Sequence, residues 1–148
     1  MCKPKNIFLI GYRCTGKTSV GKCLAHRLSR RFVDCDQALV NQAGLTVADI
    51  VAKFGWDRFR SLEKEILEQI CIESHQVVAT GGGVVLDEDN VRLMRDNGYV
   101  VWLRADEKTL DQRRPLYELA MNTAVDTDRK NIDAICSEIA DGIRLKFT

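Results

Sequence analysis

The sequence predicts one α/β domain in which a parallel sheet is covered by helices on both faces. Short apolar runs alternate along the 148 residues with longer segments whose apolar residues recur at helical spacing. Continuous apolar strands are typical of parallel sheets that are buried on both sides. No internal repeat, low-complexity stretch or linker interrupts this alternation, so we expect residues 1–148 to form a single domain.

Each element is predicted from its local pattern. Apolar runs bounded by glycine or polar residues predict the strands, and apolar residues three or four apart predict the helices. Gly55 and Gly98 are expected to end the helices that precede them. The expected strands are Asn6–Ile10, Phe32–Val33 (running into Asp34), Gln76–Ala79, Tyr99–Leu103 and Asn122–Val125. The expected helices are Lys17–Arg31, Thr46–Phe54, Trp56–Ser74, Asp89–Asn97 and Asn131–Leu145.

Charge and composition exclude several classes of protein. The 22 basic residues nearly balance the 21 acidic ones, so no field of one sign favours nucleic acid or an anionic membrane as the partner. The apolar run Ile7–Ile10 is too short for a signal peptide or a membrane span. Six cysteines without a Cys-x-x-Cys pair favour reduced thiols over a disulfide scaffold. We expect a cytoplasmic monomer that acts on a small molecule.

Residues Gly11–Thr18 match the phosphate-binding pattern G-x-x-x-x-G-K-[ST] between an expected strand and an expected helix. The N–H groups of such a loop form an anion nest, and the helix that follows points its positive end at the same place. Lys17 can reach the β- and γ-phosphates as a catalytic residue, and the Thr18 hydroxyl can ligate Mg²⁺. The expected ATP contacts are Gly11, Cys14, Thr15, Gly16, Lys17, Thr18 and Ser19.

The thiol of Cys14 lies inside this loop, next to a helix N-terminus that favours the thiolate. A reactive thiol and an inert, space-filling one both remain open. If the thiol is reactive, its alkylation should slow when ATP and Mg²⁺ are present.

Three further clusters follow expected strands or lie early in a helix. Asp34 and Asp36 follow the second strand, where one carboxylate could orient water on Mg²⁺ and the other could accept a proton from a hydroxyl. Asp34 could instead be a helix N-cap. Arg58-Phe59-Arg60 offers guanidinium groups that suit a carboxylate, although arginines on a helix often only face solvent. Thr80–Gly83 contains three successive glycines, which favours backbone held close to a ligand over a plain flexible turn.

In this order and spacing the motifs resemble the shikimate kinase family. The similarity runs from about Lys5 to Leu103, with a shorter tail at Pro115–Glu118. Gluconate kinases share the phosphate loop but not the whole set. The resemblance implies the nucleoside-monophosphate-kinase fold, a three-layer P-loop NTPase domain whose parallel sheet has the order 2-3-1-4-5. It also implies transfer of the ATP γ-phosphate to the 3-hydroxyl of shikimate, on the route to aromatic amino acids.

The resemblance also implies roles for individual residues. Asp36 would hold the ring hydroxyls beside the attacking one, and Asp34 would lie near Mg²⁺, so both count as catalytic. Arg60 would pair with the substrate carboxylate. The glycines Gly81, Gly82 and Gly83 would offer backbone N–H groups to the substrate.

The chain departs from the family pattern after Leu103. The family has a mobile lid with an Arg-Pro-Leu-Leu stretch and, later, an Arg-x-Pro-Leu-Tyr stretch with a second substrate arginine. This chain has only Gln112–Tyr117, as if the lid between the two had been lost. Arg113 is assigned to the substrate, with Arg114 left as the alternative. A lost lid predicts slower transfer and more futile ATP hydrolysis.

A smaller departure is Trp56, where the family often has Glu. Its ring could line the acceptor site or anchor the start of the helix in the core. The preferred function is that of a Mg²⁺- and ATP-dependent shikimate kinase. Two alternatives stay open, a kinase for another polyol acid such as gluconate and a non-catalytic nucleotide-binding relative.

Overall fold

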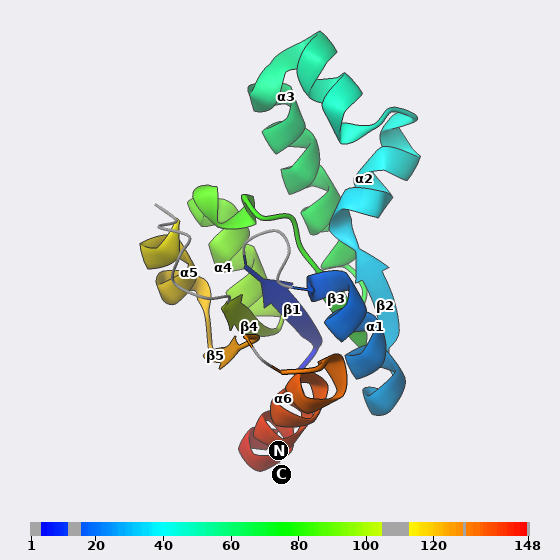
Figure 1. The fold of residues 1–148 in the computed structure, drawn as a ribbon. Helices are drawn as coiled ribbons and strands as arrows, with labels where there is room; N and C mark the ends of the chain where they lie inside the picture. Colours follow the sequence, from blue (N-terminus) through cyan, green and yellow to red (C-terminus); the bar gives the residue numbers. More distant parts are fainter. Residues whose placement is uncertain (1–3, 12–15, 105–112, 129, 148) are drawn as a thin grey trace.

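The computed structural model describes residues 4–11, 16–104, 113–128 and 130–147, and in them five parallel strands form one sheet (Figure 1). The strand order is β2-β3-β1-β4-β5, which confirms the predicted order. The register pairs Leu9 of β1 with Ala79 of β3, and Asp34 of β2 with the same Ala79. The strands are β1 (Asn6–Ile10), β2 (Arg31–Asp34), β3 (Gln76–Ala79), β4 (Tyr99–Arg104) and β5 (Thr123–Asp126).

The helices agree with the prediction except at two places where helices were not expected. One is α2, which begins directly after Asp34, and the other is α5, which begins at Arg114. The first expected helix also ends earlier, because Ser29 adopts a left-handed conformation and Arg31 already belongs to β2. The helices are α1 (Lys17–Leu28), α2 (Cys35–Ala43), α3 (Val47–Ile70), α4 (Glu88–Asn97), α5 (Arg114–Ala120) and α6 (Ile132–Phe147), with a 3₁₀ turn at Val84–Leu86.

Gly55, which was expected to end one helix before a second begins, instead lies at a kink inside the longest helix. Gly55 lies inside α3 with φ 84° and ψ 171°, which breaks the helical path there. A side chain disfavours a positive φ, so glycine is the residue that allows this kink. The kink separates the two expected helices, Thr46–Phe54 and Trp56–Ser74, and the second ends at Ile70, before the expected Ser74.

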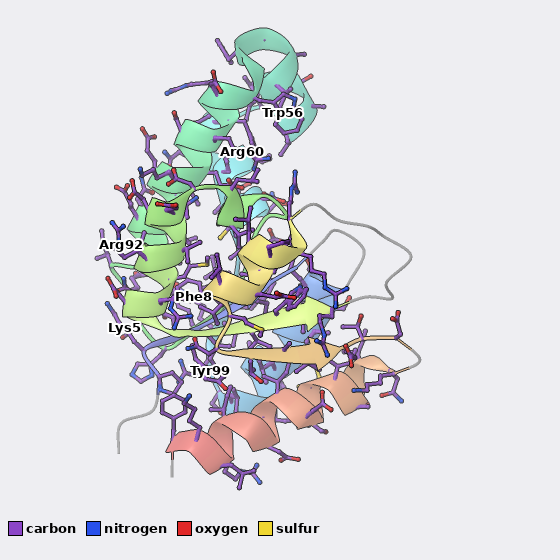
Figure 2. All side chains as sticks on the ribbon, turned by 90° about the vertical axis from the view of Figure 1, so that its left-hand side faces the viewer. Lys5, Phe8, Trp56, Arg60, Arg92 and Tyr99 are labelled. Atoms are coloured by element: carbon purple, nitrogen blue, oxygen red, sulfur yellow. The ribbon has the colours of Figure 1, made fainter. Side chains whose placement is uncertain are left out.

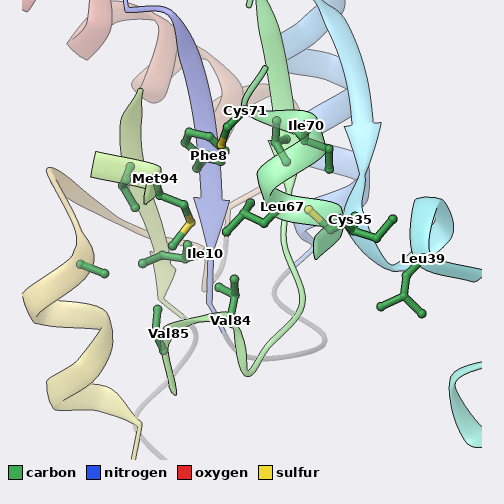
Figure 3. Close-up of a cluster of buried hydrophobic side chains, with 14 of the residues drawn as sticks. Phe8, Ile10, Cys35, Leu39, Leu67, Ile70, Cys71, Val84, Val85 and Met94 are labelled. Atoms are coloured by element: carbon green, nitrogen blue, oxygen red, sulfur yellow. The ribbon is translucent and has the colours of Figure 1, made fainter. Parts of the chain in front are cut away.

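Two apolar clusters, one on each face of the sheet, form the core. Side chains that alternate along β1 enter different clusters, Phe8 and Ile10 on one face and Ile7 and Leu9 on the other. The first cluster packs against α3, α4 and α5 (Figure 3), and the second against α1 and α6. The three layers are visible in Figure 2, where α6 lies below the strands and α4 and α5 lie above them.

This layering brings the expected site residues to one edge of the sheet. Because the strands are parallel, the segments that follow β1, β2 and β3 all leave at the same edge. Thr80, directly after β3, holds this edge together, since its backbone N–H and its hydroxyl both donate to the carbonyl of Leu9, at 3.1 and 2.8 Å. Within the described residues, no helix is long and apolar enough to cross a membrane.

Candidate active site

The phosphate loop is described at its two ends, whereas Cys14 and Thr15 lie outside the described residues. Gly11 has φ 146°, and Gly16 has φ 83° and is the N-cap of α1. Lys17 donates a hydrogen bond from its ammonium group to the carbonyl of Gly11, so its side chain folds back over the loop. The first turn of α1, Lys17–Val20, has no acidic residue to neutralise the positive helix end. This end of the site therefore suits an anion.

The Asp34 carboxylate is the N-cap of α2, one of the two alternatives from the sequence, and its second oxygen remains available for other contacts. One oxygen, Oδ1, caps α2 by accepting from the backbone N–H groups of Asp36 and Gln37, at 3.0 and 3.2 Å. The other, Oδ2, accepts from the Thr18 hydroxyl at 3.1 Å. The pair of hard oxygen donors fits Mg²⁺, which takes few protein ligands and keeps waters and phosphate oxygens around it. Thr18 and Asp34 are therefore the residues that could hold this ion.

A cavity of about 210 Å³ lies next to Asp36 and holds most of the expected substrate contacts. Four separate parts of the chain contribute to it: the start of α2, the kinked region of α3, the glycine segment after β3 and the start of α5. Its walls combine acidic, basic, aromatic and backbone groups. The lining residues are Asp36, Val47, Trp56, Phe59, Arg60, Glu63, Gly81, Gly82, Gly83 and Arg113.

Arg60 is the central cation of this cavity. Its guanidinium carbon lies 5.4 Å from the centre of the Trp56 ring and 5.2 Å from that of Phe59. Its Nη1 donates to both carboxylate oxygens of Glu63, at 3.1 and 3.3 Å. These contacts hold a planar cation in one orientation, which is the condition for binding a carboxylate through two hydrogen bonds. Arg58, two residues earlier, is exposed and does not line the cavity.

Glu63 belongs to the cavity although the roles assigned from the sequence did not include it. Its side chain is only 4 % exposed, and burial raises its pKa from the ordinary value of 4.5, while the charge and hydrogen bond of Arg60 oppose that rise. The negative charge of Asp36 raises this pKa further, and Arg113 lowers it. The spacing Arg60–Glu63, one helical turn, was the available signal.

Two glycines of the segment, Gly81 and Gly83, lie in close contact with charged side chains. A Cβ on Gly81 would lie 2.9 Å from an oxygen of Glu63 and 3.0 Å from one of Asp36. A Cβ on Gly83 would lie 2.4 Å from Nη1 of Arg60. The backbone therefore passes directly against the charged groups of the cavity, an approach that the absence of side chains at these positions permits.

The structure shows where the residues lie whose roles the sequence left open. Arg113 lines the cavity, whereas Arg114 faces outward, with its Nε 3.5 Å from an oxygen of Glu118 on the same helix. Trp56 is 55 % exposed and lines the cavity, where its ring meets Phe59 edge to face at 5.8 Å, so it is not a core anchor (Figure 2).

Comparisons with known proteins identify one family. The family model described as shikimate kinase matches residues 13–113. A shikimate kinase of Symbiobacterium thermophilum is 35% identical over an alignment that covers 94% of this chain and 96% of that protein. The structure of a shikimate kinase from Acinetobacter baumannii in complex with shikimate has a TM-score of 0.90 at 27% identity, covering 97% of this chain and 94% of that one.

A more distant structural neighbour has the same fold at lower sequence identity. A gluconokinase from Sinorhizobium meliloti has a TM-score of 0.62 and 18% identity, over 99% of this chain and 95% of that one, so it shares the fold alone. The alignment with the Symbiobacterium protein spans 167 positions against the 148 residues of this chain, so at least 19 positions have no counterpart here. Between β4 and α5 only residues 105–113 are available.

Proposed function

The chain belongs to the shikimate kinase family, and we propose that the cavity beside Asp36 is where it binds shikimate for phosphorylation at the 3-hydroxyl. Enzymes of this family are phosphotransferases that use ATP and act on an alcohol, and we assign the same reaction to this chain. The single observation that carries the assignment of the cavity is the convergence of Asp36, Arg60 and Gly83 on one cavity, in which the backbone of Gly83 lies against the guanidinium of Arg60.

On the donor side, the phosphate loop would bind ATP through its backbone N–H groups and the N-terminus of α1. Lys17 would neutralise charge on the β- and γ-phosphates, after exchanging its bond to the Gly11 carbonyl for phosphate oxygens. Mg²⁺ would be held by the Thr18 hydroxyl and by Asp34, directly or through water. When bound, the ion supplies positive charge that stabilises the transferring phosphoryl group.

On the acceptor side, Arg60 would receive the substrate carboxylate, with Arg113 as the second cation that lines the cavity. Asp36 would accept a hydrogen bond from the attacking hydroxyl and then its proton, while the hydroxyl oxygen forms the new bond to phosphorus and ADP leaves. The N–H groups of the Gly81–Gly83 segment would bind ring hydroxyls. Catalysis would then depend on positioning and charge neutralisation.

We further propose that the positions without counterpart in this chain fall between β4 and α5, where the family pattern places a lid. A shorter connection covers the donor site less completely, so water competes better with the acceptor hydroxyl. We expect a higher ratio of ATP hydrolysis to transfer than in relatives of full length. Residues 1–148 would form one domain, and the composition favours a monomer in the cytoplasm.

The test is the release of ADP by the purified chain with ATP and Mg²⁺, in the presence of shikimate, of gluconate or of no acceptor. Shikimate should stimulate release, and gluconate should leave it at the level without acceptor. Stimulation by gluconate alone would overturn the assignment of the substrate.

A second candidate function, nucleotide binding without turnover, is favoured by the same missing positions. Calorimetric titration separates it from the first. Shikimate and ATP binding without any shikimate-dependent ADP release would establish the non-catalytic function and exclude the kinase.

A further inference from the structure

Tyr117 contacts the glycine segment of the cavity from inside the protein. Its side chain is 1 % exposed, and its hydroxyl donates a hydrogen bond of 2.6 Å to the carbonyl of Gly82. Its ring is stacked on Trp102 of β4, with ring centres 5.7 Å apart and planes 25° from parallel. Gly82 lines the cavity and Tyr117 does not, so the hydroxyl reaches the segment on the side away from the cavity.

The carbonyl that Tyr117 binds belongs to the same peptide unit as the N–H of Gly83. That unit is planar, and no peptide bond of the described chain is cis, so its oxygen and its N–H point in opposite directions. When the hydroxyl fixes the Gly82 oxygen toward the protein interior, the N–H of Gly83 must point away from it. Gly82 and Gly83 both line the cavity, so an N–H that points away from the buried ring of Tyr117 is directed toward the cavity side of the segment.

This peptide unit needs an external restraint because glycine lies on both sides of it. Without a Cβ, both residues allow a wide range of φ and ψ, so rotation of the peptide plane costs little. A hydrogen bond from a buried, stacked ring supplies the restraint. It also polarises the amide, since a carbonyl that accepts a hydrogen bond strengthens the N–H of its own unit as a donor.

The same tyrosine is tied to the second cation of the cavity. The backbone N–H of Tyr117 donates to the carbonyl of Arg113 at 3.0 Å, in the first turn of α5. The end of that helix is held separately, by Nη1 of Arg95 at the carbonyls of Leu119, Ala120 and Met121. Tyr117 therefore links the start of α5, where Arg113 lies, to the glycine segment on the adjoining wall.

We propose that Tyr117 is a positioning residue of the acceptor site, whose hydroxyl orients the Gly82–Gly83 peptide so that the Gly83 N–H faces the acceptor. The inference rests on the proposed function of the cavity as the shikimate site. In this role Tyr117 contacts neither ATP nor shikimate and acts only through the backbone N–H of Gly83.

The test uses Tyr117→Phe, which removes the hydroxyl and keeps the ring on Trp102. We expect the KM and Kd for shikimate to rise about fivefold, within a range of about two- to tenfold for one hydrogen bond, while the KM for ATP stays unchanged. Amide hydrogen exchange of the 80–86 segment should become faster in the variant without ligand. Tyr99→Phe is the matched control, because Tyr99 is also buried but packs in the other core cluster, against Phe147.

The outcomes separate this inference from the proposed function. If the wild type neither binds nor phosphorylates shikimate, the proposed function fails, and the exchange of the 80–86 segment still tests the restraint by Tyr117. If the wild type works and Tyr117→Phe changes neither the shikimate constants nor the exchange, the inference is wrong. An equal rise of both KM values with a lower Tm would mean a purely structural role and would also overturn it.

Discussion

The donor and acceptor sides of the candidate active site differ in how much of the chain each requires. The donor side is built mainly from one loop and the first turn of α1, with Asp34 added from the end of β2. The acceptor cavity draws on four parts of the chain, from Asp36 to Arg113. A contiguous loop depends on local backbone geometry, whereas the cavity depends on how helices pack on the sheet. Substitutions should therefore act differently on the two sides.

The largest effect is expected on the donor side, for Lys17→Ala. Loss of this charge at the phosphates should lower kcat by about 10²–10³-fold or more, because charge stabilisation in the transition state is lost. The Kd for shikimate should change little. Coupled ADP-release assays and calorimetry measure the two quantities. Lys22→Ala, at an exposed position of the same helix, is the control, and normal turnover of Lys17→Ala would contradict the assigned role.

The next effect is expected on the acceptor side, for Arg60→Lys. An ammonium group cannot reproduce the planar fork that lies against Trp56 and Glu63, so the KM for shikimate should rise about 10–100-fold. The KM for ATP should stay within about twofold, on the same physical argument. Arg58→Lys, on an exposed neighbour, is the matched control. Equal effects on both substrates would mean that the two sides are not separable.

A methyl group added at Gly83 tests the acceptor cavity without changing any charge. In Gly83→Ala the new Cβ would start 2.4 Å from Nη1 of Arg60, so the guanidinium must move. We expect about a tenfold rise in the KM for shikimate, of the size that one charge-assisted hydrogen bond contributes. The unfolding midpoint should fall only slightly, because the displaced atom ends a flexible side chain. Unchanged steady-state kinetics would show that the close approach of Gly83 has no role in binding.

The smallest effect is the pH dependence of stability that arises from Glu63. Because burial raises its pKa in the folded protein, Glu63 contributes stability below about 4.5, its unfolded value, and this contribution is lost as pH rises through the folded pKa. The free energy of unfolding of Glu63→Gln, relative to wild type, should therefore increase between pH 4.5 and pH 7.

Urea denaturation at several pH values measures this difference. Glu65→Gln, at an exposed position of the same helix, is the control and should follow the wild-type profile. A Glu63→Gln difference that stays constant with pH would mean that burial of Glu63 does not perturb its ionisation. Such a result would mean that the acceptor cavity does not raise the pKa of Glu63.

The sequence alone determined the features that depend on local pattern. Strand runs, helical periodicity and the glycine break at Gly55 follow from the conformational preferences of short segments, and the phosphate loop is one such segment. The two helices that were not expected, α2 and α5, are short, and α5 packs beside the 3₁₀ turn after the glycine segment. Their positions depend on packing more than on their own periodicity.

Only the tertiary structure decided which charged groups meet. The fold brings Glu63 to Arg60, places Arg113 at the cavity and Arg114 beside Glu118, and exposes Trp56 at the cavity instead of burying it in the core. It also places the hydroxyl of Tyr117 at the Gly82 carbonyl. These contacts join residues that are a helical turn to several tens of positions apart, and each is selected by burial and side-chain direction. No local pattern encodes those quantities, because they arise when helices of the folded chain pack on a common sheet.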